Sequence, residues 1–193
     1  MMSKIIYVLD NNESTEYKYN ICEDTIIYHF SINSSSKVEV NLVEDNVSLY
    51  YYYNNINYDD NVFNIKINHL SNNSHSEVFN HGVNVKCNKL TYNVYGVVLK
   101  EFSKCRCMQD NQIINMDNGK STILPILLID NYDVDSNHSA YIGKFREEEI
   151  FYLMSRGISR SVANKILLNG FLINSDSLEL DKINEFVLEI EKI

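Results

Sequence analysis

The sequence predicts an α+β protein that is mostly β, with the strands first and a short group of helices last. Apolar and polar residues alternate with a period of two in several segments between Lys4 and about Asp130, which is typical of half-buried strands. Polar clusters separate these segments, and no strong helical pattern interrupts them. After about Ser139 the apolar residues take helical spacing. Strands followed by helices indicate the α+β class.

Three segments carry the strand prediction most clearly, because each alternates apolar with polar residues. Their predicted inward-facing residues are Val38, Val40 and Leu42; Phe63, Ile65 and Ile67; and Val83, Val85 and Cys87. Cys87 is therefore expected to be a core residue.

Short, evenly spaced strands fit a sandwich, a barrel or a β-solenoid. Within the strand region, the turn Asn118-Gly119 is the one Asn-Gly or Asp-Gly dipeptide, the type of a two-residue hairpin, which favours a solenoid over a hairpin-rich sheet. The chain has one proline and many asparagines. Asparagine tolerates the left-handed backbone of tight corners, although an AT-rich genome would also explain its abundance.

Three amphipathic helices are expected at the end of the chain. The first begins at Glu147 and ends at Gly157, which suits a left-handed C-terminal cap. The second begins after the N-cap Ser159 and ends at Gly170. The third begins near Asp176 in a capping box that ends at Glu179. Their expected buried faces are Ile150, Leu153 and Met154; Val162, Ala163, Ile166 and Leu167; and Leu180, Ile183, Phe186, Val187 and Ile190.

The composition narrows the function. A formal net charge of −9 argues against nucleic acid and anionic membrane surfaces as partners. The first residues lack the apolar run of a signal peptide, so we expect a cytoplasmic protein whose four cysteines are reduced. The sequence has no glycine loop that cradles phosphate, so an ATPase would be a separate chain.

One ordered window resembles a known family. It contains Ile150-Phe151-Tyr152-Leu153, then Ser155-Arg156-Gly157-Ile158, then Ala163 and Gly170-Phe171, and it follows His138. This pattern is similar to the C-terminal signature of the SufB/SufD family of iron–sulfur cluster assembly proteins. The segment Leu124 to Ile129 resembles the family's proline-containing strand before the histidine. The chain is shorter than most members and looks like a divergent SufD-like one.

The resemblance implies a right-handed parallel β-helix at residues 1–138 and a helical subdomain at residues 139–193. It also implies a non-catalytic, scaffold-type subunit that pairs with a SufB-like subunit or with itself. Its helices would bind a SufC-type ATPase, through Phe145, Glu149, Phe151, Tyr152, Arg156 and Gly157.

The resemblance further implies that an iron–sulfur cluster is a transient cargo rather than a tightly bound cofactor. His138 aligns with the family's ligand histidine, although a surface or interface role would also explain it. Asp110 and Ser136 stand where the family has cysteines, and neither side chain replaces a thiolate well. Cys105 and Cys107 lie nearby and would face one side of a strand, as shared ligands or as buried thiols without a role.

Two competing functions remain. The chain could be a β-helix interaction module that has lost the pathway role, as its short length and missing cysteines suggest. An enzyme on a β-solenoid, such as a polysaccharide lyase or hydrolase, would need a cluster of acidic residues that the spacing does not show. We find no carboxylate or serine partner for His29, His69, His75 or His81 from the sequence, so a hydrolytic triad has no support.

Overall fold

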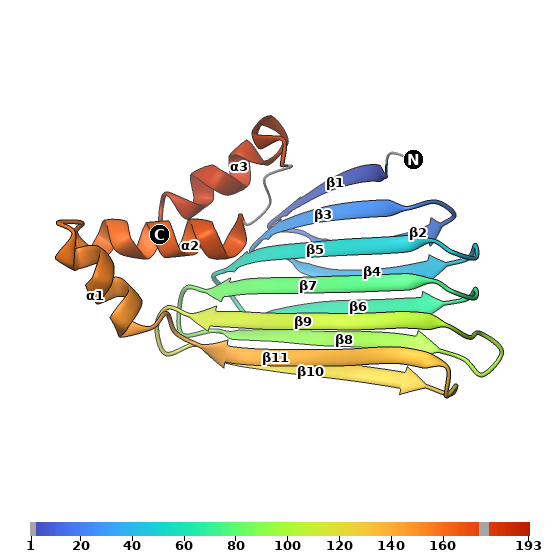
Figure 1. Ribbon diagram of the computed structural model, residues 1–193. Helices are drawn as coiled ribbons and strands as arrows, with labels where there is room; N and C mark the ends of the chain where they lie inside the picture. The colour runs from blue at the N-terminus through green and yellow to red at the C-terminus, as the bar shows by residue number, and fades with distance from the viewer. Residues whose placement is uncertain (1–2, 174–177) are drawn as a thin grey trace.

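The computed structural model describes residues 3–173 and 178–193. Its body consists of two stacked parallel β-sheets, between which the chain alternates (Figure 1). The six-stranded sheet contains, in order, β1 (Lys4–Asn11), β3 (Thr25–Ile32), β5 (Ser48–Asn57), β7 (His75–Asn84), β9 (Cys105–Asn115) and β11 (Val134–Gly143). The five-stranded sheet contains, in order, β2 (Ser14–Ile21), β4 (Ser35–Leu42), β6 (Asn61–His69), β8 (Lys89–Val98) and β10 (Lys120–Ile129). This winding confirms the predicted parallel β-solenoid.

Asparagines form the corners of the coils. Asn12 and Asn33 adopt positive φ values of 54° and 49° in successive coils, and Asn46 and Asn73 adopt 65° and 52° at the opposite corner. Their amides also bond between coils, since Asn33 Nδ2 donates to Asn12 Oδ1 at 3.1 Å and Asn73 Nδ2 donates to Asn46 Oδ1 at 2.6 Å. Asparagine tolerates this left-handed backbone better than most residues, which confirms the structural explanation for its use at these corners.

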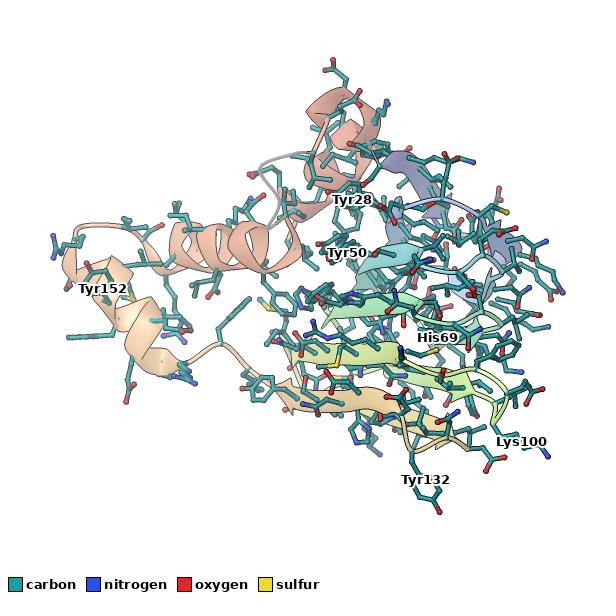
Figure 2. The ribbon with its side chains drawn as sticks, turned by 45° about the vertical axis from the view of Figure 1, so that its right-hand side comes forward. Tyr28, Tyr50, His69, Lys100, Tyr132 and Tyr152 are labelled. Atoms are coloured by element: carbon teal, nitrogen blue, oxygen red, sulfur yellow. The ribbon has the colours of Figure 1, made fainter. Side chains whose placement is uncertain are left out.

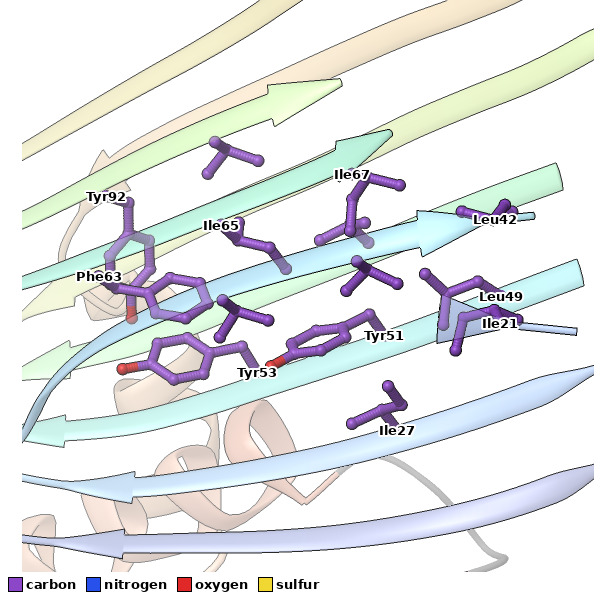
Figure 3. Packing of buried hydrophobic residues seen from close by; sticks show 14 of the residues in the cluster. Ile21, Ile27, Leu42, Leu49, Tyr51, Tyr53, Phe63, Ile65, Ile67 and Tyr92 are labelled. Carbon is purple, nitrogen blue, oxygen red and sulfur yellow. The ribbon is translucent and has the colours of Figure 1, made fainter. Parts of the chain in front are cut away.

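The interior between the sheets is filled by aliphatic and aromatic side chains (Figure 3). Two of the predicted alternations are confirmed, since Val38, Val40 and Leu42 and also Phe63, Ile65 and Ile67 are at most 1% exposed. The rings of Tyr53 and Phe63 stack across the interior with centroids 3.5 Å apart.

The third alternation was assigned to the wrong surface. Val83 and Val85 pack beneath the helices, on the outer face of the six-stranded sheet, and not inside the solenoid. Cys87 lies beyond the end of β7 and is exposed, and its thiol donates to Asp117 Oδ2 at 3.4 Å. Helices that cover a sheet bury its outward residues as well, so alternation alone does not identify the inner face there.

The three helices are α1 (Glu147–Ser155), α2 (Arg160–Leu172) and α3 (Leu180–Ile190). They gather at the end of the solenoid to which the strands of the six-stranded sheet point (Figure 1). Ile183, Phe186 and Ile190 of α3 are buried as predicted, and the rings of Phe186 and Phe30 lie 4.9 Å apart. The C-terminal helix therefore packs against the first strands of the chain.

Several helix predictions need correction. The second helix passes Gly170 and ends at Leu172, because nothing forces glycine there out of helical geometry. Its buried residues are Ala163, Leu168 and Leu172, whereas Val162 and Ile166 are exposed, because α2 turns the opposite side toward the sheet. The third helix begins at Leu180 with Glu179 as N-cap, and Asp176 of the predicted capping box lies outside the described residues.

The last strand passes through residue 138, where the sequence places the domain boundary, and continues to Gly143. Within the described residues, none of the helices combines the length and the apolar character needed to cross a bilayer.

Candidate functional site

A groove on the six-stranded sheet contains the predicted ligand His138. The register places His138 opposite Gln109, and Ser139 opposite Asp110. The groove encloses about 230 Å³ where β7, β9 and β11 run side by side. Its lining includes Glu77, Phe79, Arg106, Met108, Gln109, Asp110, Asn137, His138 and Ser139.

His138 is an exposed imidazole on the last strand. The register continues a row of inward-facing residues, Tyr51, Val78 and Gln109, to His138. Among the described residues no further strand of the sheet follows β11, so no strand covers this position. Among residues 3–173 and 178–193, no side chain or backbone group forms a hydrogen bond with the His138 ring. The ring is therefore available to a ligand or a partner.

Asp110 is a carboxylate whose oxygens are already occupied. It accepts hydrogen bonds from the Ser139 hydroxyl and from Gln112 Nε2, the latter at 2.9 Å. His81 Nε2 lies 3.7 Å from Asp110 Oδ2, which is too long for a hydrogen bond. Interaction with His81, and then the bonds from Ser139 and Gln112, lower the pKa of Asp110 to about 2, although burial opposes them. Asp110 is thus a hard, anionic oxygen donor and not a substitute for a thiolate.

Cys105 and Cys107 do not face this groove. Both thiols point into the solenoid and are 2% and 1% exposed. Burial raises the pKa of Cys107 to about 11, so its thiol is protonated at neutral pH. Neither thiol lines the groove, although the register places both on the same inner side of the sheet as His138. Within the described parts of the chain, no group of three or more histidine, cysteine, aspartate or glutamate side chains is placed to hold a metal ion.

The turn between α1 and α2 holds a second set of predicted residues. The N–H of Gly157 donates to the carbonyl of Met154 at 3.0 Å, and the N–H of Ile158 donates to that of Leu153 at 3.4 Å. Gly157 has a φ of 85°, so it closes α1 in a Schellman motif, as predicted. The guanidinium of Arg156 lies 5.1 Å from the centre of the Tyr152 ring. This cation–π contact fixes two of the predicted docking residues side by side.

The helical end exposes an apolar surface. Phe151 and Tyr152 on α1 are 72% and 58% exposed, and Val162 and Ile166 on α2 are 48% and 45% exposed. Between the two helices lies a hollow of about 400 Å³ whose lining includes Tyr152, Leu153, Ile166 and Leu167. Exposed apolar patches of this kind mark interaction sites.

Two predicted docking residues, Phe145 and Glu149, line a second hollow, and Glu149 also lines the first. This second hollow is a cleft of about 590 Å³ between the helices and the last strands, and its lining includes Tyr141, Arg146 and Phe171. The Phe145 ring meets the Phe171 ring edge-on, with centroids 6.3 Å apart. Phe145 thus helps to seat the helices against the solenoid.

The prediction that four histidines have no carboxylate or serine partner is wrong. His29 Nε2 lies 2.7 Å from Asp10 Oδ2, and His75 Nε2 lies 2.9 Å from Glu77 Oε1. Both ring nitrogens of His69 contact serine hydroxyls, and His81 faces Asp110. Residues one coil apart meet in a solenoid, so the pairs of His29 with Asp10 and of His81 with Asp110 become visible only once the coil length is known. His29 and His69 are fully buried, so neither is a catalytic base for an external substrate.

The fold and the sites together define a parallel β-solenoid protein with an unpaired sheet edge and an apolar helical end. Residues 10–171 match the family model described as SUF system FeS cluster assembly, SufBD core domain. The chain therefore belongs to the SufBD core domain family, which confirms the resemblance seen in the sequence and extends it toward the N-terminus.

Several curated proteins are similar to parts of the chain. The iron–sulfur cluster assembly protein SufD of Bacillus subtilis is 31% identical over 111 residues, which are 57% of this chain and 25% of that protein. SufB of the same organism is 31% identical over 108 residues, or 55% of this chain and 23% of that protein. A SufBD family protein of Pyrococcus horikoshii is 44% identical over 61 residues, or 32% of this chain and 13% of that protein. The matched regions thus span a quarter or less of these relatives.

Proposed function

We propose that this protein is a non-catalytic component of cytoplasmic iron–sulfur cluster assembly that binds a SufC-type ATPase through its helical end. The observation that carries the proposal is the exposed apolar surface of α1 and α2 within a chain of the SufBD core domain family. Phe151 and Tyr152 are large, mostly exposed rings, which is the type of side chain that dominates protein interfaces.

A pair of tyrosines tests this docking surface. Tyr152 lies on α1 and Tyr132 in a loop near the opposite end of the solenoid, and both are exposed (Figure 2). The ATPase from the same organism should co-purify with the wild-type protein and with Tyr132→Asp, and Tyr152→Asp should abolish this. Failure of a well-folded wild-type sample to retain the ATPase at micromolar concentration would refute the partner, and equal retention by both variants would refute the surface.

We further propose that the last coil pairs with a SufB-like subunit or with a second copy. The edges of β10 and β11 have no further strand beside them in their sheets. Leu124 and Leu128 on the outer side of β10 are 47% and 53% exposed, whereas β2 and β4 present Glu16 and Lys37 on the same face. Unpaired edges beside apolar residues favour association.

The pairing proposal has a matched control on the same sheet. The double variant Leu124→Asp, Leu128→Asp should weaken the dimer or the complex, as measured by light scattering. Val62→Asp, at a 39% exposed position on β6, should leave it intact. Equal effects of the two substitutions would argue against this edge.

In this reading His138 contributes an imidazole to a transient cluster whose thiolates come from the partner, since Asp110 and Ser136 supply none. Anaerobic addition of iron and sulfide to the complex should give visible cluster absorption, which His138→Ala reduces and His75→Ala does not. If the complex gives no such absorption, direct ligation by this chain is wrong. The same two replaced cysteines favour the alternative, an interaction module that has left the pathway.

A further inference from the structure

Two buried thiols and a buried imidazole form a continuous chain of contacts inside the solenoid, apart from the groove at His138. His69, near the end of β6, places Nδ1 2.8 Å from the Ser74 hydroxyl and Nε2 2.8 Å from the Ser76 hydroxyl (Figure 2). Ser74 Oγ lies 3.5 Å from Cys105 Sγ, and Ser76 stands opposite Cys107 in the register of β7 and β9. Each thiol therefore lies beside a serine that contacts one nitrogen of the same ring.

This series of contacts is shielded from water, and its burial determines whether the imidazole and the thiols at its ends carry a proton. His69, the two serines and the two cysteines are each at most 2% exposed. Burial, assisted by repulsion from His75, lowers the pKa of His69 to about 4, so the imidazole is neutral at neutral pH. A neutral imidazole has one N–H and one lone pair. One serine hydroxyl must therefore donate a hydrogen bond to the unprotonated ring nitrogen. The oxygen of that serine can in turn accept the proton of a thiol.

The space beside the thiols has features of a site and not only of packing. Cys105 and Cys107 project from the same side of β9, about 6.6 Å apart along the strand. The next inward residue, Gln109, is 4% exposed, and neither amide atom of its side chain has a hydrogen-bond partner among the described residues. Gly96 lies opposite, and a Cβ there would stand 2.4 Å from Cys107 Sγ. The sulfur thus occupies the space that a side chain at residue 96 would fill, and a buried polar group lies next to it.

We propose that Cys105 and Cys107 bind a soft monovalent metal ion of the Cu(I) class as a two-coordinate dithiolate. Thiolates select such ions, whereas Zn²⁺ requires four ligands, which this cluster does not offer. A surface hollow of about 350 Å³ reaches Cys105. Its lining includes Asp133 and Asp135 and also Lys104 and Arg106, and Arg106 Nε lies 3.6 Å from Asp135 Oδ2. Among the described residues, Cys105 is thus the thiol of the pair that borders this hollow.

The reaction leaves no net charge in the interior. Two S–H bonds break and two S–metal bonds form, one proton passes through Ser76 to His69, and the other leaves to solvent. The charges of the ion, the two thiolates and the imidazolium sum to zero, which avoids the cost of burying an unbalanced charge.

The test uses the full chain in which Cys22→Ser and Cys87→Ser remove the two exposed thiols. This parent protein is titrated without oxygen, first with Ag(I) as a redox-inert probe and then with Cu(I). We expect one ion per chain, with ultraviolet thiolate-to-metal absorption. Adding Cys105→Ser or Cys107→Ser should remove both signals while circular dichroism stays unchanged. If the parent protein, which keeps both buried thiols, binds no more metal than the Cys105→Ser or Cys107→Ser variant, the site is refuted.

A third variant tests the imidazole. His69→Asn keeps both thiols, and should weaken binding by about 10- to 100-fold, the usual effect of changing a residue behind a metal ligand. It should also release two protons to solvent per ion bound, where the parent releases one. Unchanged affinity and unchanged proton release would refute the role of His69.

Discussion

His81 Nδ1 lies 3.1 Å from the carbonyl oxygen of Phe171, and the two rings stack with centroids 4.8 Å apart. Through this contact β7 holds the end of α2 against the solenoid. The other nitrogen of His81 faces Asp110 in the groove. One side chain thus touches both the helical end and the groove beside His138.

Replacing His81 should loosen the helical end. In His81→Ala the Phe171 carbonyl loses its donor and the stacking is lost, so we expect a cost of about 2 kcal/mol in the free energy of unfolding. Hydrogen exchange should rise in α2 and stay unchanged in β3 to β6. His75→Ala on the same strand is the control, because His75 is half-buried and contacts only neighbours on the sheet. Equal exchange in α2 for both variants would contradict this role.

His69 should make stability depend on pH between about 6.5 and 4. The pKa of His69 is about 4 in the folded protein, below its ordinary value of 6.5, because burial disfavours the charged ring. The unfolded chain therefore binds the proton first as the pH falls. The free energy of unfolding should decrease over this window, by up to about 3 kcal/mol.

Urea unfolding at a series of pH values measures this slope. His69→Gln should flatten it in that window, while His138→Gln, at an exposed position, should leave it in place. The carboxylates Asp10 and Asp110 have lowered pKa values and add their losses at lower pH. A wild-type protein equally stable at pH 4 and pH 6.5 would show that His69 is not buried and neutral.

The four cysteines should react in two groups. Cys22 and Cys87 are exposed, whereas Cys105 and Cys107 are buried and the pKa of Cys107 is raised to about 11. Thiolate is the reactive form, so iodoacetamide at neutral pH should label the first two in the native protein. Mass spectrometry should find the other two labelled only after unfolding. Rapid native labelling of Cys107 would mean that the last coils are open.

Gly157 and Gly170 form a matched pair of glycines. Gly157 has a φ of 85° and no atom close enough to obstruct a Cβ, so Gly157→Ala should cost about 1 kcal/mol from backbone strain alone. Gly170 lies in α2, also with open space around it, so Gly170→Ala should stabilise the protein by about 0.5–1 kcal/mol. Thermal unfolding measures both changes, and the same sign for both would contradict the assigned cap.

Much of the fold could be predicted from local pattern. The alternation at Val38 to Leu42 and at Phe63 to Ile67 fixes the inner face of β4 and β6, because both strands have one solvated side. Period two is shared by sandwiches, barrels and solenoids, however, so the winding of the chain needed the resemblance. The strand alternation failed at Cys87 and the helical spacing failed at Val162, because the buried face there depends on which element covers which.

The site was less predictable than the fold. The motif around Gly157 identified the turn, since its backbone requirement is local. The contact between His81 and Asp110 joins adjacent strands of one sheet that are separated by a full coil, so it depends on register, which spacing did not reveal. For the same reason the sequence predicts only that Cys105 and Cys107 share one face of a strand. It does not predict that this face points into the solenoid, where neither thiol lines the groove.

Sedimentation velocity of the protein mixed with the SufC-type ATPase of the same organism is the decisive experiment for docking at the helical end. We expect one faster-sedimenting complex at micromolar concentrations, which persists with Tyr132→Asp and disappears with Tyr152→Asp. Separate sedimentation of the two well-folded proteins at those concentrations would contradict it.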